Sequence, residues 1–348
     1  MAQTEDPVPA PGADTAAMRP AFGPDLIGWG FAVLMLALAS GRGWLGLGRD
    51  YLEYVDYYRR IPPFFSFQDT RFEPGFHLVA WVFANVLGLP FWSFASAVVL
   101  AALAVKAYLF RRYLTYPVAA MVVYLATFYP NQEYTQIRAA AAISFGMLAI
   151  HLFFGRRFVI AAAVAALAFT FHYSIVLLFG GFALAFALRR NLPSLVAVSV
   201  IGVLMAGAML SGGGLNNVII TWFSTFNPLV GNYVDNIAAI DAASIWSVNN
   251  LIVIAIFGAA VAGGWLSDGR YRKCFTIMFG LSVVFVVVLG QSPIIAVRAK
   301  EMLLVAVVFA AFRTPLGRRD LAAVALIAAN AALLLFLAVR EGVILSST

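Results

Sequence analysis

Residues 136–154 read QIRAAAAISFGMLAIHLFF, and this stretch decides the class of fold. After Arg138 it contains no acid, lysine or second arginine. It is almost as long as the run of about 20 apolar residues that crosses a bilayer as a helix. The stretch therefore predicts a membrane-spanning helix that carries a permanent cation in its first turn.

The composition of the whole chain indicates the same class. Hydrophobic residues make up 63% of the 348 residues and charged residues 11%, whereas a soluble domain carries about 25% charged residues. The net charge of +7 does not indicate nucleic-acid binding, because the basic residues lie in short clusters between apolar runs. One cysteine, Cys274, excludes an internal disulfide and a thiolate metal cluster. We therefore expect an all-α, polytopic integral membrane protein with no nucleic-acid partner.

Eleven apolar runs are expected to span the membrane, and the segment 75–90 would make twelve if it crosses. Residues 1–24 are rich in Pro, Ala and Asp and are expected to be a disordered tail, followed by a single transmembrane domain over 25–348. The run 158–171 is the shortest, so its helix is expected to extend beyond these bounds. The eleven runs are 24–41, 92–111, 115–130, 136–154, 158–171, 173–189, 193–211, 249–266, 274–290, 294–312 and 320–338.

The basic clusters set the expected orientation, because Lys and Arg favour the cytoplasmic side of short loops. Clusters follow every second span, at residues 111–112, 156–157, 189–190, 270–273 and 313–319. These loops should therefore be cytoplasmic. The segments left for the outer face are a large loop at 42–91, residues 129–138, the turn at His172, a second loop at 212–248 and the turn at 291–298.

The segment 75–90, GFHLVAWVFANVLGLP, does not fit this alternation if it crosses the membrane. We expect it to be an interfacial or re-entrant helix within the outer loop. Irregular backbone at membrane depth is tolerated only where it packs on protein or lines a wet cavity. The alternative is a true crossing, which would place the N-terminus outside and residues 42–74 in the cytoplasm.

The first outer loop, 48–77, has the densest group of side chains that could take part in catalysis or bind sugars. Carboxylates take protons from hydroxyl groups and bind sugar hydroxyls, and aromatic faces offer flat surfaces to sugar rings. If 50–58 is helical, Asp50, Tyr54 and Tyr57 share one face. The alternative is a solvated loop with interfacial tyrosines. The acids and tyrosines of this loop are Asp50, Glu53, Asp56, Asp69, Glu73, Tyr51, Tyr54, Tyr57 and Tyr58.

Arg138 has two interpretations at its helix start. A guanidinium binds phosphate or diphosphate with two parallel hydrogen bonds, which would make it an anion clamp. It can also reach lipid headgroups as a simple membrane anchor. Gln136 lies two residues away and therefore does not share its face.

His172 and Arg298 also lie at expected outer helix ends. His172 is either a structural turn residue or a general base or phosphate donor. Arg298 precedes Glu301 by three residues, so the two side chains are placed to pair on the helix surface.

Four motifs in this order resemble the EpsG family of Wzy-like polysaccharide polymerases. A later arginine, Arg298, fits the family more loosely. The family typically has Ile-Arg-Gln, whereas here Gln136 precedes the arginine. The motifs are Gly48, Asp50, Tyr51 and Tyr54; Glu73 to Phe76; Arg138 with Ala139; and Phe171, His172 and Ser174.

The resemblance implies a glycosyltransferase-C-like enzyme of the bacterial inner membrane that makes exopolysaccharide or O-antigen. It would join undecaprenyl-diphosphate-linked repeat units on the periplasmic or outer face, with a flippase or a chain-length regulator as possible protein partners. The catalytic candidates are Asp50, which is the first choice for the general base, followed by Glu73 and His172. The substrate-binding candidates are Arg138, Arg298, Tyr51, Tyr54, Gln136 and Asp56.

No cofactor is expected. Walker, HExxH and CxxC motifs are absent, and the GRGWLG match at 41–46 follows a membrane span rather than a strand. The carboxylates suit a divalent metal, but no ligand spacing demands one. Two other functions stay open: a transferase that adds one sugar from a polyprenyl-phosphate donor, and a flippase for lipid-linked glycans.

Overall fold

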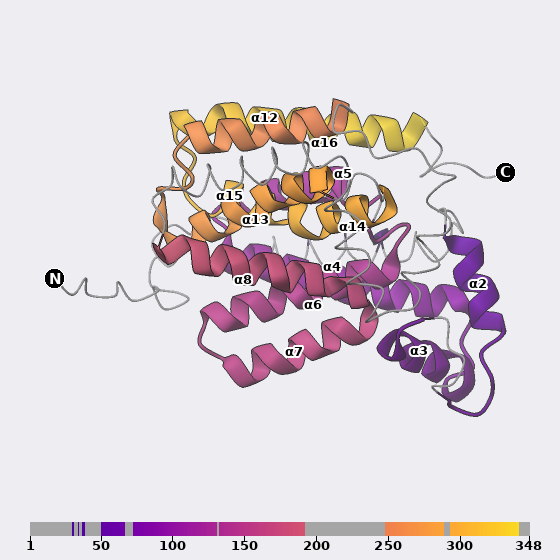
Figure 1. Ribbon diagram of the computed structural model, residues 1–348. Coiled ribbons are helices and arrows are strands. Elements are labelled where there is room, and N and C mark those ends of the chain that lie inside the picture. Colours follow the sequence, from indigo (N-terminus) through magenta and orange to yellow (C-terminus); the bar gives the residue numbers. More distant parts are fainter. Residues whose placement is uncertain are drawn as a thin grey trace. The chain divides into compact units, whose positions relative to one another are not determined.

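The computed structural model describes residues 30, 34, 37, 38, 50–66, 72–130, 132–191, 248–288 and 293–340, and their regular secondary structure is entirely helical (Figure 1). The prediction of an all-α protein is thereby confirmed. The expectations for 1–24, 193–211 and 212–247, and for most of 24–41, lie outside the described residues. The chain divides into two compact units, unit 1 from residues 1–176 with 332–348 and unit 2 from residues 177–331. Whether these form a single transmembrane domain stays a prediction.

Unit 1 is built around helix α6, which packs against α4 and α7. Ala139 to Ala142 of α6 are buried, and such small side chains let helix backbones approach closely. Pro74 and Pro117 each occupy the first turn of a helix, where a missing N–H costs nothing. The helices are α2 (Tyr51–Arg59), α3 (Pro74–Trp81), the π-helix η2 (Val82–Val86), α4 (Phe91–Tyr113), α5 (Pro117–Thr127), α6 (Ile137–Phe154) and α7 (Phe158–Phe171).

Aromatic rings of α2 and α3 pack against an aromatic ring in the first turn of α4. The ring of Phe94 in α4 lies 5.1 Å from that of Phe76 in α3 and 5.5 Å from that of Tyr58 in α2. Edge-to-face and offset pairs at such distances add about 0.5–1.5 kcal/mol each beyond the area they bury. This packing fixes the start of α3, and with it Glu73, relative to α4.

The segment 75–90 forms α3 and η2, which run without a break over Pro74–Val86. At about 1.5 Å per residue this helix spans only about 20 Å, well short of the roughly 30 Å hydrocarbon core. Gly88 then turns the chain with a φ of 60°. The length agrees with an interfacial or re-entrant helix, which stays a prediction.

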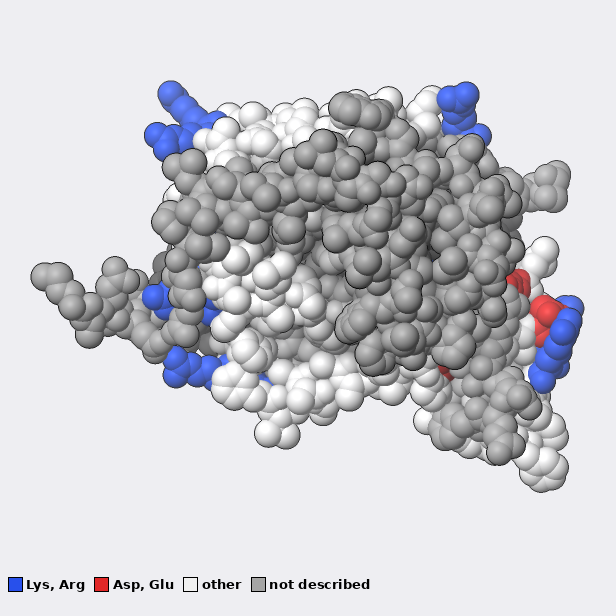
Figure 2. Space-filling model, in the orientation of Figure 1, with Lys and Arg blue, Asp and Glu red and all other residues white. Residues whose placement is uncertain are grey.

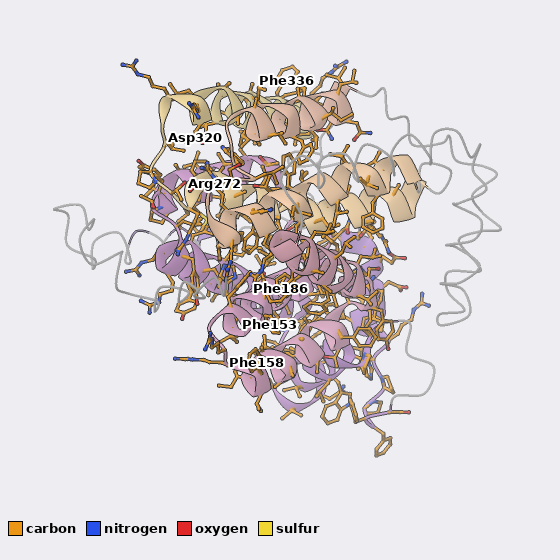
Figure 3. The ribbon with its side chains drawn as sticks, turned by 60° about the vertical axis from the view of Figure 1, so that its left-hand side comes forward. Phe153, Phe158, Phe186, Arg272, Asp320 and Phe336 are labelled. Carbon is orange, nitrogen blue, oxygen red and sulfur yellow. The ribbon has the colours of Figure 1, made fainter. Side chains whose placement is uncertain are left out.

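Three helices among the described residues are long and apolar enough to cross a membrane: Phe91–Tyr113, Ile137–Phe154 and Arg318–Leu337. Several shorter apolar helices accompany them. Outward-facing side chains such as Phe158 and Phe336 are 55% and 61% exposed, which suits contact with lipid (Figure 3). The protein is therefore a membrane protein, whereas a count of eleven or twelve spans stays a prediction.

The expectation that the helix extends beyond 158–171 is wrong. The helix α7 begins at Phe158 and ends at Phe171. Before it, Arg156 adopts the left-handed φ of 60°. After it, His172 is extended, with φ −162° and ψ 115°. Both conformations leave the α-helical region, so the helix cannot continue in either direction.

Unit 2 contains the remaining helices. The expected span 294–312 is divided into two helices, α14 and α15. The helices are α8 (Val176–Asn191, whose first residue belongs to unit 1), α12 (Val248–Ala262), α13 (Gly269–Val288), α14 (Pro293–Leu304), α15 (Ala306–Phe312) and α16 (Leu321–Arg340, whose last nine residues from Ala332 belong to unit 1).

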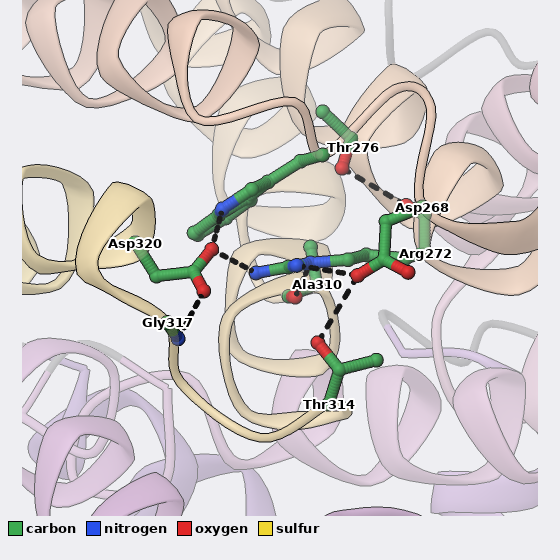
Figure 4. A network of polar contacts seen from close by, with 8 residues as sticks. Asp268, Arg272, Thr276, Ala310, Thr314, Gly317 and Asp320 are labelled. Carbon is green, nitrogen blue, oxygen red and sulfur yellow. Dashed lines mark hydrogen bonds and ion pairs between the residues drawn. The ribbon is translucent and has the colours of Figure 1, made fainter.

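A buried arginine of α13, Arg272, connects this helix to α15 and to the residue before α16 (Figure 4). The guanidinium of Arg272 donates to Asp268 at 2.6 Å, to Asp320 at 2.7 Å and to the Ala310 carbonyl at 2.9 Å. The indole N–H of Trp265 donates to the same Asp320 oxygen at 2.6 Å. A buried guanidinium needs such complete pairing, because an uncompensated charge is costly to desolvate.

Candidate functional site

A buried carboxylate, Glu73, is the centre of the polar site in unit 1. It directly precedes α3, and its side chain meets residues 65 and 99 positions later in the sequence. One oxygen, Oε2, accepts a hydrogen bond from Arg138 Nη1 of α6, and the other, Oε1, lies 2.8 Å from Nδ1 of His172. Oε1 also accepts the backbone N–H of Tyr173 at 3.4 Å. Three predicted site residues therefore meet at one ion-paired centre.

Because Gly75 has no side chain, α3 can approach α7 closely enough for Glu73 to contact His172. A Cβ atom at Gly75 would lie 2.3 Å from Thr170 Oγ1 and 2.8 Å from Thr170 Cβ. Both distances are far below van der Waals contact. Thr170 lies two residues before His172, so the Glu-Pro-Gly motif places the carboxylate beside the imidazole by allowing the two helices to touch.

We expect Gly75→Ala to lower activity at least tenfold, because α3 must move away from α7 and take Glu73 away from His172. The polymer formation that the family resemblance implies, measured with the purified variant, checks this. Thr170→Gly in the same chain removes the Thr170 side chain and should restore part of the activity. Gly258→Ala is the matched control, since no atom lies within 4 Å of the Cβ it adds. Full activity of Gly75→Ala would contradict this role for the motif.

Aromatic rings surround the guanidinium of Arg138. Its Cζ lies 4.1 Å from the centre of the Phe72 ring, and its Nε donates to the hydroxyl of Tyr54 at 3.4 Å. Cation–π contact of this kind is worth about 0.5–2 kcal/mol, more where water is excluded. The guanidinium is thus held by a carboxylate and by rings, which favours a built binding site over a headgroup anchor.

The pKa of Glu73 results from opposing effects. Burial alone would raise it, but the hydrogen bond with His172 and the positive charge of Arg138 outweigh burial and lower the pKa to about 2. Glu73 is therefore ionised at any physiological pH, and a carboxylate with so low a pKa is a weak proton acceptor. Its place in the geometry is to hold Arg138 and His172.

The depressed pKa predicts how stability changes with pH. The folded value of about 2 lies below the ordinary 4.5. The stabilisation from ionised Glu73 is therefore complete above about pH 4.5 and is lost as the pH falls toward about 2. We expect the wild-type Tm to fall more than that of Glu73→Gln below about pH 4.5, by an amount equivalent to about 3 kcal/mol over the whole range. Thermal unfolding in detergent measures this, with Glu53→Gln as control. If the Tm of wild type and the Tm of Glu73→Gln fell equally with pH, this prediction would be contradicted.

The other candidates of the first loop lie along α2. Asp50 precedes the helix and is half-buried, one turn before Tyr54. Tyr51 packs edge-on against Phe91 with centroids 5.4 Å apart. Asp56 is exposed and pairs with Arg60 at 2.8 Å. Figure 2 shows acidic and basic atoms side by side at the right-hand edge of this face, the side on which Figure 1 shows α2. Residues 51–59 are helical, with Asp50 directly before the helix, and Tyr54 of this helix contacts Arg138.

Among the described residues, no hydrogen bond joins the side chains of Gln136 and Glu73. Gln136 precedes α6 and is half-buried, and its backbone N–H donates to the Gln132 carbonyl at 2.8 Å. Arg298 belongs to α14 of unit 2, where it is half-buried. Their substrate-binding roles stay predictions. In the described part of the chain, no three His, Cys, Asp or Glu side chains gather closely enough to hold a metal ion.

The sequence analysis missed two polar contacts of unit 1. The hydroxyl of Tyr57 hydrogen-bonds to Nδ1 of His77, which is 2% exposed and lies four residues after Glu73 on α3. The second contact is a network around Lys106, a lysine buried in the middle of α4. Each had a visible signal, namely a single histidine or lysine within an apolar run.

Lys106 is fully compensated in the interior of unit 1. Its ammonium donates to Glu133 Oε1 at 2.6 Å, to Ser144 Oγ at 2.5 Å and to the Ala140 carbonyl at 3.2 Å. The hydroxyl of Tyr124 binds both oxygens of Glu133 at 2.6 and 2.7 Å. The turn before α6, expected as a polar outer segment, is therefore buried at Glu133 and tied to α4, α5 and α6.

These helices and this buried polar site define a membrane protein with an ion-paired carboxylate–arginine–histidine centre. A model of the EpsG family matches residues 26–341, which is most of the chain. The chain therefore belongs to the EpsG family, as its motifs predicted, and is a polysaccharide-polymerase-like membrane protein. No curated protein and no solved structure matches it.

Proposed function

We propose that this protein is a glycosyltransferase that polymerises undecaprenyl-diphosphate-linked repeat units on the outer face of the bacterial inner membrane. The observation that carries the proposal is the joint contact of Glu73 with Arg138 and His172. It places an anion-binding guanidinium and a titratable imidazole on the same buried carboxylate. Family membership supports the same class of reaction.

In the proposed reaction, a hydroxyl group of the acceptor sugar attacks the anomeric carbon of the lipid-linked chain. A new carbon–oxygen bond forms, and the bond from the anomeric carbon to the diphosphate oxygen breaks. The diphosphate is already an activated leaving group, so neither a nucleotide nor ATP is needed. The hydroxyl proton passes to a base of the protein and then to water.

The geometry favours His172 as that base, ahead of Asp50 and Glu73. A neutral imidazole that donates its Nδ1 proton to Glu73 carries a lone pair on Nε2, where it can accept a proton. Glu73 would fix this tautomer and stabilise the imidazolium that forms, as the carboxylate does in a catalytic triad. Asp50 stays the alternative base, since it begins the helix that carries Tyr54.

Arg138 is suited to the leaving diphosphate. Its Nη1 binds Glu73 and its Nε binds Tyr54, and no described residue accepts from the two N–H donors of Nη2, which suits them to a ligand. Negative charge grows on the diphosphate in the transition state, so a fixed cation there lowers the barrier. The paired carboxylate holds the guanidinium in place before substrate arrives.

The decisive experiment supplies the purified protein in nanodiscs with an undecaprenyl-diphosphate-linked repeat unit and resolves the products by length. A ladder of products supports a polymerase, whereas a single addition identifies a single-sugar transferase. Movement of the lipid across vesicles without any product identifies a flippase. If Arg138→Ala and Asp50→Asn both polymerise like wild type while well folded, the proposed site is wrong.

A further inference from the structure

A second buried histidine of unit 1, His77, lies one helical turn after Glu73. Its backbone N–H donates to the Glu73 carbonyl at 2.9 Å, and the residue is 2% exposed. Its Nδ1 shares a hydrogen bond with the hydroxyl of Tyr57 in α2. A polar pair from α2 and α3 therefore lies close to the carboxylate at the centre of the site.

The ring of Phe72 contacts both Tyr57 and Arg138. Its centre is 4.4 Å from the centre of the Tyr57 ring and 4.1 Å from Arg138 Cζ. Burial raises the pKa of Tyr57 to about 12, while the charge of Arg138 opposes this rise and that of Glu73 adds to it. The phenol is therefore protonated at physiological pH and lies within reach of both charged groups of the site.

Aromatic rings enclose the imidazole of His77. The ring of Phe65 stacks on it with centroids 5.5 Å apart, and the ring of Tyr57 meets it edge-on at 6.1 Å. An apolar side chain would pack here without the cost of desolvating an imidazole. A few polar groups held among aromatic rings are typical of sites that bind small molecules. The position of this pair beside Arg138 therefore indicates a binding role.

The hydroxyl of Tyr57 keeps bonding capacity beyond its contact with His77. Within the described residues it hydrogen-bonds to His77 alone, and Tyr57 is half-buried. If the phenol donates to Nδ1, its oxygen can still accept, and if Nδ1–H donates to the phenol, the phenol can still donate. A sugar hydroxyl both donates and accepts, so it complements the phenol in either arrangement. A diphosphate only accepts, and an isoprenoid chain does neither.

We propose that Tyr57 binds a hydroxyl group of the sugar bonded to the diphosphate at Arg138, and that His77 positions the phenol. This inference rests on the proposed function, which places the diphosphate of the lipid-linked chain at the guanidinium. The anomeric carbon is bonded directly to that diphosphate, so its sugar has to lie beside Arg138. Tyr57 is then a specificity-determining residue, and His77 is a positioning residue.

The test compares probes with and without a sugar, bound to the full chain in phosphatidylcholine nanodiscs and measured by isothermal titration calorimetry. The probes are farnesyl diphosphate and its conjugates with glucose, galactose and N-acetylglucosamine. Wild type should bind at least one conjugate more tightly than farnesyl diphosphate. Tyr57→Phe should weaken binding of that conjugate about five- to tenfold, the worth of one hydrogen bond, and leave farnesyl diphosphate unchanged.

Tyr58→Phe is the matched control, because it removes the next hydroxyl of α2. That hydroxyl donates to the Leu89 carbonyl at 2.7 Å. The variant should therefore bind the conjugate and farnesyl diphosphate with the same ratio of affinities as wild type. Because the ratio compares two probes on one protein, a smaller folded fraction does not change it.

Two variants of His77 test its positioning role. The side chain of His77→Asn keeps a hydrogen-bonding group near the position of Nδ1, whereas that of His77→Leu does not. The asparagine variant should therefore retain more of the affinity gained from the sugar. Equal retention by both variants would show that His77 does not position Tyr57.

A further measurement starts from wild type and changes the probe. In a set of conjugates, each hydroxyl group of the preferred sugar is replaced in turn by hydrogen. One of these deoxy probes should bind wild type about five- to tenfold more weakly than the full conjugate. The same replacement should cost nothing further in Tyr57→Phe, because the two changes remove one shared contact.

The outcomes separate the two proposals. If wild type binds none of the probes, the proposed function fails and this inference fails with it. If Arg138→Ala weakens every probe while Tyr57→Phe weakens none, the function stands and the sugar contact is overturned. Equal weakening of farnesyl diphosphate and the conjugate in Tyr57→Phe would show that Tyr57 acts only through Arg138, and would overturn the contact as well. So would a wild type that binds no conjugate more tightly than farnesyl diphosphate.

Discussion

Glu73→Gln is expected to lower the rate of polymerisation by about 10³-fold, the largest loss of any conservative change in this protein. An amide has no charge to hold the guanidinium of Arg138, and it no longer favours the imidazolium form of His172. Losing the carboxylate partner of a catalytic histidine, or one donor to the developing charge, costs about 10²–10⁴ in rate in other enzymes. Here one substitution disturbs both groups.

The measurement is kcat for the lipid-linked repeat unit, together with Tm. Glu53→Gln is the matched control, because it makes the same change at an exposed position of α2. A Glu73→Gln protein that folds and keeps more than about a tenth of the wild-type kcat would exclude Glu73 from the site. A loss of Tm alone, with kcat retained in the folded fraction, would assign Glu73 a purely structural role.

Lys106→Met is expected to destabilise the protein by about 3–5 kcal/mol. The substitution leaves the carboxylate of Glu133, which is fully buried, without its cation, and breaking a buried ion pair from one side costs about this much. The effect should appear as a large fall in Tm in detergent. Lys273→Met is the control, because Lys273 is less deeply buried.

A second variant separates lost charge compensation from lost packing. Glu133→Gln added to Lys106→Met removes the unpaired charge and keeps an oxygen that accepts the Tyr124 hydroxyl. The double variant should therefore be more stable than the sum of the two single changes predicts. Strict additivity would show that Lys106 and Glu133 do not act as a pair.

The sequence analysis predicted candidate residues of the site, but it did not predict which of them contact one another. Glu73 was predicted from the acid-rich first outer loop and from the family resemblance, and Arg138 and His172 from their chemistry at expected outer helix ends. Their meeting at one carboxylate depends on packing between helices that are 65 and 99 residues apart in sequence, which no local pattern reveals. The sequence analysis ranked Asp50 ahead of Glu73 and His172 as the base, whereas the contact of His172 with Glu73 favours His172 in the proposed reaction.

Helix positions were well predicted where a long apolar run sets them, as for α4 and α6. The exceptions arise where a backbone conformation determines the end of a helix or where a buried partner compensates a charge. Arg156 and His172 end α7 with non-helical dihedral angles that composition does not show. Lys106 lies within an apolar run, and nothing in that run indicates that Glu133 compensates it.

The contact of Gly75 with Thr170 has a consequence for the path that a sugar chain can take. Because α3 touches the backbone and side chain of α7 there, a glycan cannot thread between these two helices at that level. The rings of Phe72 and Tyr54 lie against the guanidinium of Arg138. Under the proposed function, changes of bulk at those two positions should therefore alter which sugars the site accepts.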